Sequence, residues 1–265
     1  MSGKSIRLGR FLGEGKTVAV VAADHGAEFG PIEGLMNLPA ALENLRAADG
    51  ILLNPGMLDA CGMFFADPDA PALITRLTWT TSYCFPWNYK EAHTCGILSA
   101  DEALAAGADI VMACCNLQSG DEALDRDNVE LFTQIAADAD AAGVPLIGEL
   151  YPLRAEELPE AELHEQVYRG ARILAELGAD ALKTFYTGDR FAEVVESAGI
   201  PLFVLGASKK AEEIDALRMA HKAVEAGARG VVFGRNVFQA ADPAKFLFAL
   251  VKVVHKEATP EEAMA

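Results

Sequence analysis

The sequence predicts a (β/α)8 barrel, and three features indicate this fold class. Short apolar segments alternate with segments of helical period, which is typical of a parallel sheet. The length of 265 residues accommodates the eight strand–helix units of such a barrel. One glycine-containing turn recurs at 106–109, 142–145, 177–180, 198–201 and 226–229, each time after a helical segment and before an apolar run. Glycine ends a helix readily because it adopts the left-handed conformation without steric cost.

The elements follow in order from these turns. Each predicted strand is apolar on both faces, as a parallel strand covered by helices must be; the strands are 17–23, 50–54, 72–78, 109–115, 144–151, 180–185, 201–206 and 230–234. The predicted helices between them are 40–48, 101–106, 129–142, 163–177, 190–197, 212–226 and 243–256. An open doubly wound sheet is the alternative, disfavoured because no Gly-x-Gly-x-x-Gly follows the first strand.

We therefore expect a single TIM-barrel domain over residues 1–265. Residues 1–15 form a lead-in to the first strand, and the acidic segment 257–265 is expected to fray. The segment 246–254 is apolar nearly all round, and a helix of that kind is usually covered. This pattern suggests a subunit interface and hence a homo-oligomer.

Composition and charge narrow the class of partner. Acidic residues outnumber basic ones by 39 to 22, for a net charge of −17, which disfavours nucleic acid and anionic membrane surfaces. No apolar run approaches the ~20 residues of a membrane-spanning helix, and no apolar stretch follows the positively charged start as in a signal peptide. The five cysteines include no Cys-x-x-Cys pair, so we expect reduced thiols and a cytoplasmic protein.

In a barrel, functional side chains gather at the C-terminal ends of the strands. Lys183 interrupts an apolar strand there, although lysine is seldom buried without a partner. Desolvation and nearby positive charge favour a neutral amine, which attacks carbonyls and forms Schiff bases. The alternative is an inert ion pair of Lys183 with Glu149 or Asp24, and the spacing alone leaves the two equally open.

Two further side chains are catalytic candidates. Tyr151 and Glu149 lie two residues apart and point to the same side of their strand. An inward Tyr151 would exchange a proton with a substrate beside Lys183, whereas an outward one would anchor the strand end. Asp24 either orients the lysine and a substrate hydroxyl or caps the turn at His25.

The loops after the seventh and eighth strands are the commonest phosphate site of this fold. Gly206 and Gly234 let backbone N–H groups approach an anion, Arg235 offers a donor fork, and Ser208 adds a hydroxyl. The alternative is that both glycines only make tight turns. Such a cluster would hold a phosphorylated substrate against the unfavourable overall charge, with His25 and Glu149 as further substrate-binding candidates. The aromatic segment 79–87 is expected to cover the barrel mouth and to wall the pocket.

Several motifs resemble one known family. They are Asp24-His25-Gly26 with Gly30-Pro31-Ile32-Glu33-Gly34, Tyr151-Pro152, Lys183-Thr184-Phe185-Tyr186-Thr187-Gly188-Asp189 and Gly234-Arg235-Asn236-Val237-Phe238-Gln239. From the first strand to the last helix the chain looks like the archaeal-type class I fructose-bisphosphate aldolases, of the deoxyribose-phosphate aldolase/LacD-like superfamily. The resemblance implies a (β/α)8 barrel, a Schiff-base lysine at Lys183, an acid/base tyrosine at Tyr151 and an aspartate at Asp24. It also implies a phosphate cradle over the last two strands and a ring-like homo-oligomer, often a decamer.

The chain departs from that family where the pocket is lined. It has Gly206-Ala207-Ser208-Lys209 in place of Gly-Gly-Pro-Lys, Glu149 in place of an apolar or aromatic residue, and an aromatic segment in place of a Ser-rich one. We therefore expect a class I aldolase, without metal or cofactor, that acts on a phosphorylated ketose such as fructose 1,6-bisphosphate. The alternatives are a transaldolase-like synthase of the aminodideoxyheptulosonate type, a phospho-autoinducer-2 thiolase, and a non-catalytic sugar-phosphate-binding barrel.

Overall fold

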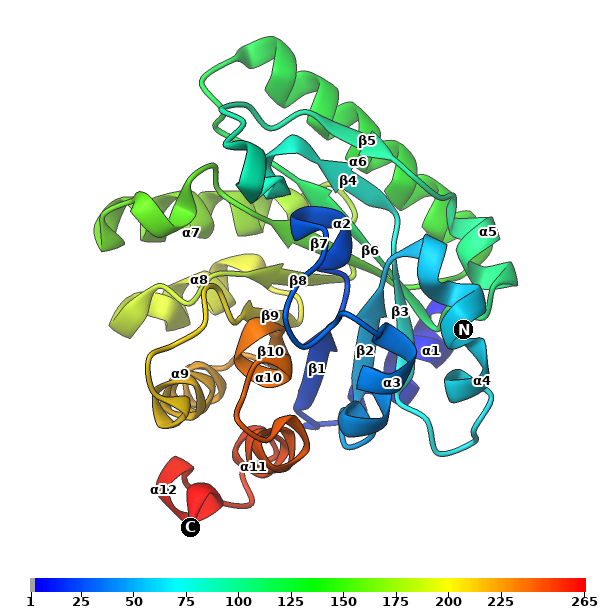
Figure 1. The fold of residues 1–265 in the computed structure, drawn as a ribbon. Coiled ribbons are helices and arrows are strands. Elements are labelled where there is room, and N and C mark those ends of the chain that lie inside the picture. The colour runs from blue at the N-terminus through cyan, green and yellow to red at the C-terminus, as the bar shows by residue number, and fades with distance from the viewer. Residues whose placement is uncertain (1–2) are drawn as a thin grey trace.

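The strands of the computed structural model, which describes residues 3–265, form a closed barrel. Met1 and Ser2 of the predicted lead-in lie outside the described residues. All neighbouring barrel strands are parallel, in the order β1-β10-β9-β8-β7-β6-β3-β2 (Figure 1). The strands are β1 (Val18–Ala22), β2 (Gly50–Leu53), β3 (Ala72–Arg76), β6 (Ile110–Cys115), β7 (Leu146–Leu150), β8 (Ala181–Thr184), β9 (Leu202–Leu205) and β10 (Gly230–Phe233). The predicted (β/α)8 barrel and all its strands are confirmed.

Helices surround the barrel and cover the strands from outside, except for α1, which closes the N-terminal end of the barrel. They are α1 (Gly3–Leu12), α2 (Gly26–Phe29), α3 (Leu38–Leu42), α4 (Leu58–Phe65), α5 (Ala100–Ala105), α6 (Glu122–Ala142), α7 (Glu160–Glu176), α8 (Phe191–Ala198), α9 (Glu213–Glu225), α10 (Arg235–Phe238), α11 (Pro243–Val254) and α12 (Pro260–Met264). Helix α6 begins well before the predicted residue 129, because the Asp121 side chain accepts hydrogen bonds from the backbone N–H groups of Ala123 and Leu124. The turns after α6 and α8 contain Gly143 and Gly199, both with positive φ, as predicted.

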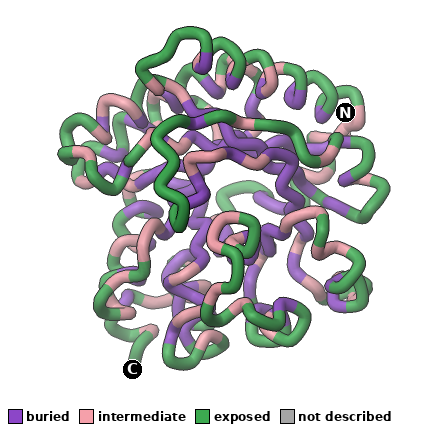
Figure 2. Tube along the Cα trace, turned by 45° about the horizontal axis from the view of Figure 1, so that its top comes forward, coloured by how far each residue is buried: buried purple, intermediate pink, exposed green. Residues whose placement is uncertain are grey.

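The barrel interior is apolar toward the N-terminal ends of the strands and charged at their C-terminal ends. Alternate residues of the strands point inward and pack with Phe11 and Leu12 of α1, which closes the N-terminal end. These inward residues are Val20, Leu52, Ile74, Met112, Ile147, Ala181, Phe203 and Val232. Figure 2 shows this buried centre inside exposed outer loops. The next inward position on several strands, two residues further on, therefore lies at the C-terminal end of the barrel.

The C-terminal segment is ordered, which corrects the expectation that 257–265 frays. Thr259 caps α12 in a capping box with Glu262, and Pro260 is buried. Helix α12 packs on α9 and α11. Because α9, α12 and strand β1 contact α11, most of its apolar surface is covered within the chain, although Phe248 stays 56% exposed.

A two-stranded hairpin lies beside the barrel mouth. Strands β4 (Thr78–Thr80) and β5 (Thr94–Gly96) pair antiparallel, and the aromatic segment between them contains two 3-10 turns, η3 (Thr81–Tyr83) and η4 (Phe85–Trp87). The Trp79 Nε1–H donates to the Ala27 carbonyl at 2.9 Å, which ties the hairpin to α2. As predicted, this segment covers the mouth and contributes to the pocket wall.

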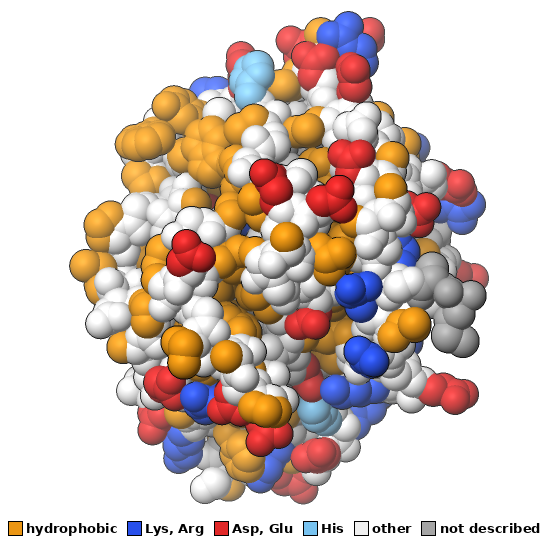
Figure 3. Space-filling view, turned by 90° about the vertical axis from the view of Figure 1, so that its right-hand side faces the viewer, with side chains coloured by type: hydrophobic (Ala, Val, Ile, Leu, Met, Phe, Trp, Pro, Cys, Tyr) orange, Lys and Arg blue, Asp and Glu red, His pale blue; other side chains and the backbone are white. Residues whose placement is uncertain are grey.

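The surface carries charges of both signs. On the face in Figure 3, acidic and basic side chains are interspersed, and hydrophobic side chains gather toward its upper left. No helix among residues 3–265 is long and apolar enough to cross a bilayer.

Candidate active site

A cavity of about 50 Å³ opens at the C-terminal ends of the barrel strands. Most of the predicted site residues line it: Asp24, His25, Glu149, Tyr151, Lys183, Gly206, Gly234 and Arg235. Ser208 lies further out, in an adjoining cavity. Glu28, Tyr83 and Phe85 also line the inner cavity. Tyr83 and Phe85 belong to the aromatic segment that was expected to wall the pocket, whereas the sequence did not single out Glu28.

Lys183 and Glu149 meet because of strand register. Glu149 on β7 is the direct partner of Lys183 on β8, and direct partners on parallel strands point the same way. The Lys183 Nζ contacts a Glu149 carboxylate oxygen in an ion pair. Lys183 is only 6% exposed, so its ammonium is held by a buried carboxylate. The sequence left an ion pair and a nucleophile open as alternatives, and the pair with Glu149 is present.

Arg76 joins the two predicted carboxylates, and the sequence reading missed it. Its Nε donates to Asp24 Oδ2 at 2.5 Å and its Nη1 donates to Glu149 Oε2 at 2.8 Å. The guanidinium lies 5.3 Å from the centre of the Tyr83 ring. A charged residue inside an apolar strand was the signal that identified Lys183, and the same signal would have identified Arg76.

The two carboxylates bonded to Arg76 are ionised. Burial raises the pKa of Glu149, but the charges of Arg76 and Lys183 outweigh it and lower the pKa to about 2. Burial likewise opposes ionisation of Asp24, whose pKa is nonetheless lowered by the same two cations. Two anions and two cations therefore balance at the centre of the site.

Two neighbouring groups are uncharged at neutral pH. Burial and the negative charge of Asp24 raise the pKa of Glu28 to about 8, so this side chain is a carboxylic acid. Burial lowers the pKa of His25 to about 4, although Asp24 opposes that change. Glu28 lies one helical turn after Asp24, with its Oε1 at 4.0 Å from Arg76 Nη2.

Tyr151 faces the cavity between two aromatic rings. Its ring packs edge-on against Tyr83 and Phe185 at centroid distances of 5.0 and 4.9 Å. Its backbone carbonyl accepts a 2.6 Å hydrogen bond from Asn116 Nδ2, which holds the strand end. Burial raises the pKa of the Tyr151 phenol, so the phenol carries its proton at neutral pH.

The loops after β9 and β10 come together as predicted. A Cβ at Gly234 would lie 2.2 Å from His25 Cε1, so a larger residue there would have to displace His25. A Cβ at Gly206 would lie 3.1 Å from Asn236 Nδ2, which would have to move by a few tenths of an ångström. The Nε of Arg235 is buried without a hydrogen-bond partner. An unpaired buried donor between two glycine turns is suited to an anion.

Ser208 stands apart from this donor. Its hydroxyl donates to the Glu156 carboxylate, whose Oε1 also lies 3.7 Å from Arg235 Nη2. The preceding Ala207 has φ of 52°, in the left-handed region that favours glycine. The Ser208 hydroxyl is thus engaged with the Glu156 carboxylate.

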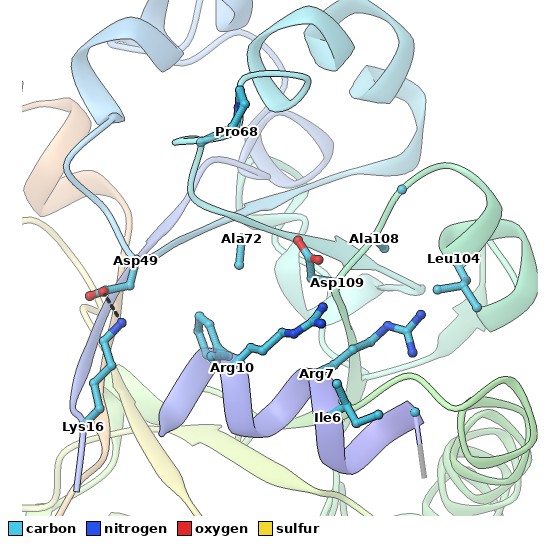
Figure 4. Close-up of a pocket in the computed structure, with 14 residues that line it drawn as sticks. Ile6, Arg7, Arg10, Lys16, Asp49, Pro68, Ala72, Leu104, Ala108 and Asp109 are labelled. Carbon is cyan, nitrogen blue, oxygen red and sulfur yellow. Dashed lines mark ion pairs between the residues drawn. The ribbon is translucent and has the colours of Figure 1, made fainter. Parts of the chain in front are cut away.

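A larger cavity, of about 830 Å³, lies at the opposite end of the barrel (Figure 4). Arg7 and Arg10 project from α1 into it, and Lys16 pairs with Asp49 at 3.0 Å. Side chains at this N-terminal end usually serve stability, whereas chemistry in this fold takes place at the other end. The candidate active site is therefore the smaller cavity around Lys183. Among residues 3–265, no group of three or more His, Cys, Asp or Glu side chains is arranged to hold a metal ion.

Comparison with known proteins identifies the family. The model of the DeoC/LacD family aldolases matches residues 18–240. An uncharacterized aldolase of Saccharolobus solfataricus is 32% identical, covering 100% of this chain and 98% of its own. The 2-amino-3,7-dideoxy-D-threo-hept-6-ulosonate synthase 1 of Archaeoglobus fulgidus is 34% identical, covering 100% and 95%.

A solved structure supports the same family assignment. An archaeal fructose-1,6-bisphosphate aldolase with its catalytic lysine covalently bound to the carbinolamine intermediate is 30% identical, with a TM-score of 0.79 over 95% of this chain and 99% of that one. The chain belongs to the DeoC/LacD aldolase family, and it is an enzyme, a lyase of the class I, Schiff-base aldolases.

Proposed function

We propose that this aldolase makes and breaks a carbon–carbon bond of a phosphorylated ketose through a Schiff base on Lys183. The observation that carries the proposal is the burial of Lys183 in the inner cavity, beside Glu149, Tyr151 and an unpaired arginine donor. Among the described residues, Lys183 is the only lysine that lines this cavity.

In the cleavage direction, the Lys183 ammonium passes a proton to the Glu149 carboxylate that it contacts, and the free amine then adds to the ketone carbon and gives a carbinolamine. The hydroxyl of the carbinolamine takes that proton and leaves as water. The resulting iminium has its positive charge offset by the ionised Glu149 and Asp24. The bond between the third and fourth carbons then breaks, and its electron pair forms an enamine with the iminium carbon. Protonation of the enamine and addition of water release the donor ketone and the free amine.

Tyr151 and Asp24 have supporting roles in this proposal. In cleavage, the protonated Tyr151 phenol takes the proton of the substrate hydroxyl as it gives its own proton to the enamine carbon, and in condensation the same relay runs in reverse. Asp24 orients a substrate hydroxyl, while Arg76 keeps Asp24 and Glu149 in place.

The phosphate of the donor half is assigned to the loops after β9 and β10. Gly206 and Gly234 leave room for close approach of the backbone, and Arg235 contributes its free Nε–H. Ser208 joins the phosphate only after its hydroxyl leaves Glu156. His25, uncharged and in the wall of the cavity, completes the site.

Two reactions fit this chemistry, cleavage of fructose 1,6-bisphosphate and a synthase reaction. Fructose 1,6-bisphosphate is the first candidate, because the archaeal structure with a carbinolamine on its catalytic lysine is an aldolase of that substrate. A synthase reaction that joins a ketose-derived donor to another aldehyde is the second, because Glu149 adds a carboxylate beside Lys183 and the Archaeoglobus relative is named as such a synthase.

The experiment is borohydride trapping on Lys183. Incubation with dihydroxyacetone phosphate and sodium borohydride should add the mass of the reduced donor to the peptide containing Lys183. Lys183→Ala should abolish the adduct and lower kcat by at least about 1,000-fold. Full turnover by this variant would reject the proposal, while release of triose phosphates from fructose 1,6-bisphosphate by the wild-type enzyme would favour the first substrate over the second.

We also propose that the enzyme works as a homo-oligomer in the cytoplasm, with a decamer as the family-based expectation. All five cysteines are free in the structure, as a reducing compartment requires. Native mass spectrometry of the purified chain measures the subunit number directly, and a monomer at micromolar concentration would contradict the assembly.

A further inference from the structure

A second cavity continues the active-site cavity outward. It has a volume of about 280 Å³, and Phe85, Tyr151 and Arg235 line both cavities. The inner cavity, about 50 Å³, is the smaller of the two and surrounds Lys183. On the proposed function, a small donor fragment is attached to Lys183 inside, so the acceptor aldehyde extends into the outer cavity.

The wall of the outer cavity is largely aromatic. The rings of Phe29 and Phe85 stack at a centroid distance of 4.9 Å and an interplanar angle of 23°. Tyr89 and Leu153 also line the cavity, and Phe85 and Tyr89 are 40% and 50% exposed. Exposed aromatic side chains that wall a cavity next to reacting groups are suited to bury an apolar part of a ligand.

The charged side chains of the outer cavity are already paired. Arg154 Nε donates to Glu157 Oε2 at 2.9 Å, and the Nη2 of Arg235 lies 3.7 Å from Glu156 Oε1. Two carboxylates therefore match the two guanidinium groups that line this cavity. A phosphate placed here would be repelled by Glu156 and Glu157, and it would displace existing pairs without gaining a free cation. The unpaired Nε of Arg235 is the donor that the proposed function assigns to the donor phosphate.

We infer that the acceptor is an aldehyde without a phosphate group, and that it carries an apolar side group which packs on Phe29 and Phe85. This inference rests on the proposed Schiff-base function, and of its two candidate reactions it favours the synthase reaction over cleavage of fructose 1,6-bisphosphate, whose acceptor aldehyde carries a phosphate. The enamine carbon attacks the aldehyde carbon and forms the new bond, while the aldehyde oxygen takes a proton to become a hydroxyl. Water then adds to the iminium and frees the amine of Lys183, so the balance requires no further reactant.

Acceptor selection is the first test. Condensation with dihydroxyacetone phosphate would be measured for D-glyceraldehyde 3-phosphate, D-glyceraldehyde and phenylacetaldehyde, with kcat/KM determined for each acceptor. We expect phenylacetaldehyde to exceed D-glyceraldehyde 3-phosphate by at least about tenfold. A higher kcat/KM for D-glyceraldehyde 3-phosphate than for D-glyceraldehyde would overturn the inference, since these two differ only in the phosphate.

Matched variants locate the acceptor. Phe85→Ala should lower the ratio of kcat/KM for phenylacetaldehyde to that for D-glyceraldehyde by about tenfold. Trp87→Ala is the control, because Trp87 lies two residues away, is 65% exposed and lines neither cavity, so its ratio should stay within about twofold. Equal changes in both variants, or none in Phe85→Ala, would also overturn the inference. Absence of the borohydride adduct on wild-type Lys183 would instead reject the proposed function, which keeps the two failures distinct.

Discussion

At the scale of single residues, Arg76 determines how charge is arranged around Lys183. Its side chain is only 2% exposed, and it donates to both Asp24 and Glu149. Without this guanidinium, two buried carboxylates would share only the Lys183 ammonium between them. Removal of one partner from a buried charge network costs more than the network itself contributes, because the remaining charges stay desolvated.

We therefore predict that Arg76→Met lowers the free energy of unfolding by about 3–5 kcal/mol. Arg76→Lys should lose less, since it keeps the charge but has no planar donor fork to hold both carboxylates. Urea denaturation of the three proteins measures this as a shift of the midpoint at constant m-value. Equal stability of Arg76→Met and the wild-type protein would contradict the prediction that Asp24 and Glu149 destabilise the fold when they are buried without the guanidinium.

At the scale of elements, the turn from β10 into α10 shapes the proposed anion site. Gly234 directly follows β10 and lies opposite His25, in the turn that follows β1. A side chain at Gly234 would meet His25 and also the Ala22 carbonyl oxygen, which lies 3.0 Å from the Cβ position. A backbone oxygen does not move aside as a flexible side chain does. The approach of β1 and β10, which are direct neighbours in the barrel, thus requires glycine.

Gly234→Ala should displace His25 and Arg235 and weaken binding of the donor, with KM for dihydroxyacetone phosphate raised at least about tenfold. Gly26→Ala is the matched control, because a Cβ at Gly26 meets nothing within 4 Å. Steady-state kinetics on both variants check this. An unchanged KM in Gly234→Ala would remove this turn from the binding site.

At the scale of the whole molecule, closure of the barrel collects ionisable groups in one desolvated place, so the stability of the fold depends on their protons. The folded chain holds the Glu28 proton up to about pH 8, because burial raises the pKa of this side chain from the ordinary glutamate value of 4.5. The stability due to this proton is fully present below pH 4.5 and is lost as the pH rises through about 8.

Glu28→Gln removes this titration and provides the comparison. Between pH 6 and pH 8, the wild-type protein should lose about 2 kcal/mol of unfolding free energy relative to Glu28→Gln. Denaturation curves for both proteins at each pH give the difference, in which the other titrating groups largely cancel. A difference that stays constant with pH would mean that Glu28 is ionised in the folded protein.

Local sequence pattern was sufficient for the barrel and for half of the site. Apolar runs bounded by helix-ending glycines specify parallel strands, because both faces of each strand are covered, and all eight runs became barrel strands. A lysine in such a run, and polar residues just past strand ends, must lie at one end of a closed barrel, so Lys183, Asp24 and Tyr151 were found together. The start of helix α6 was placed too late and helix α12 was not predicted, because a single capping side chain, Asp121 or Thr259, sets each start.

Pairing between distant segments was decided only by the tertiary structure. Arg76 meets residues 52 and 73 positions away, and no local pattern states which carboxylate a buried arginine will bond. The titration of Glu28 and the contact of Glu156 with Ser208 likewise depend on burial and on loops from different strands. Periodicity is a property of neighbours along the chain, whereas desolvation and ion pairing are properties of neighbours in space.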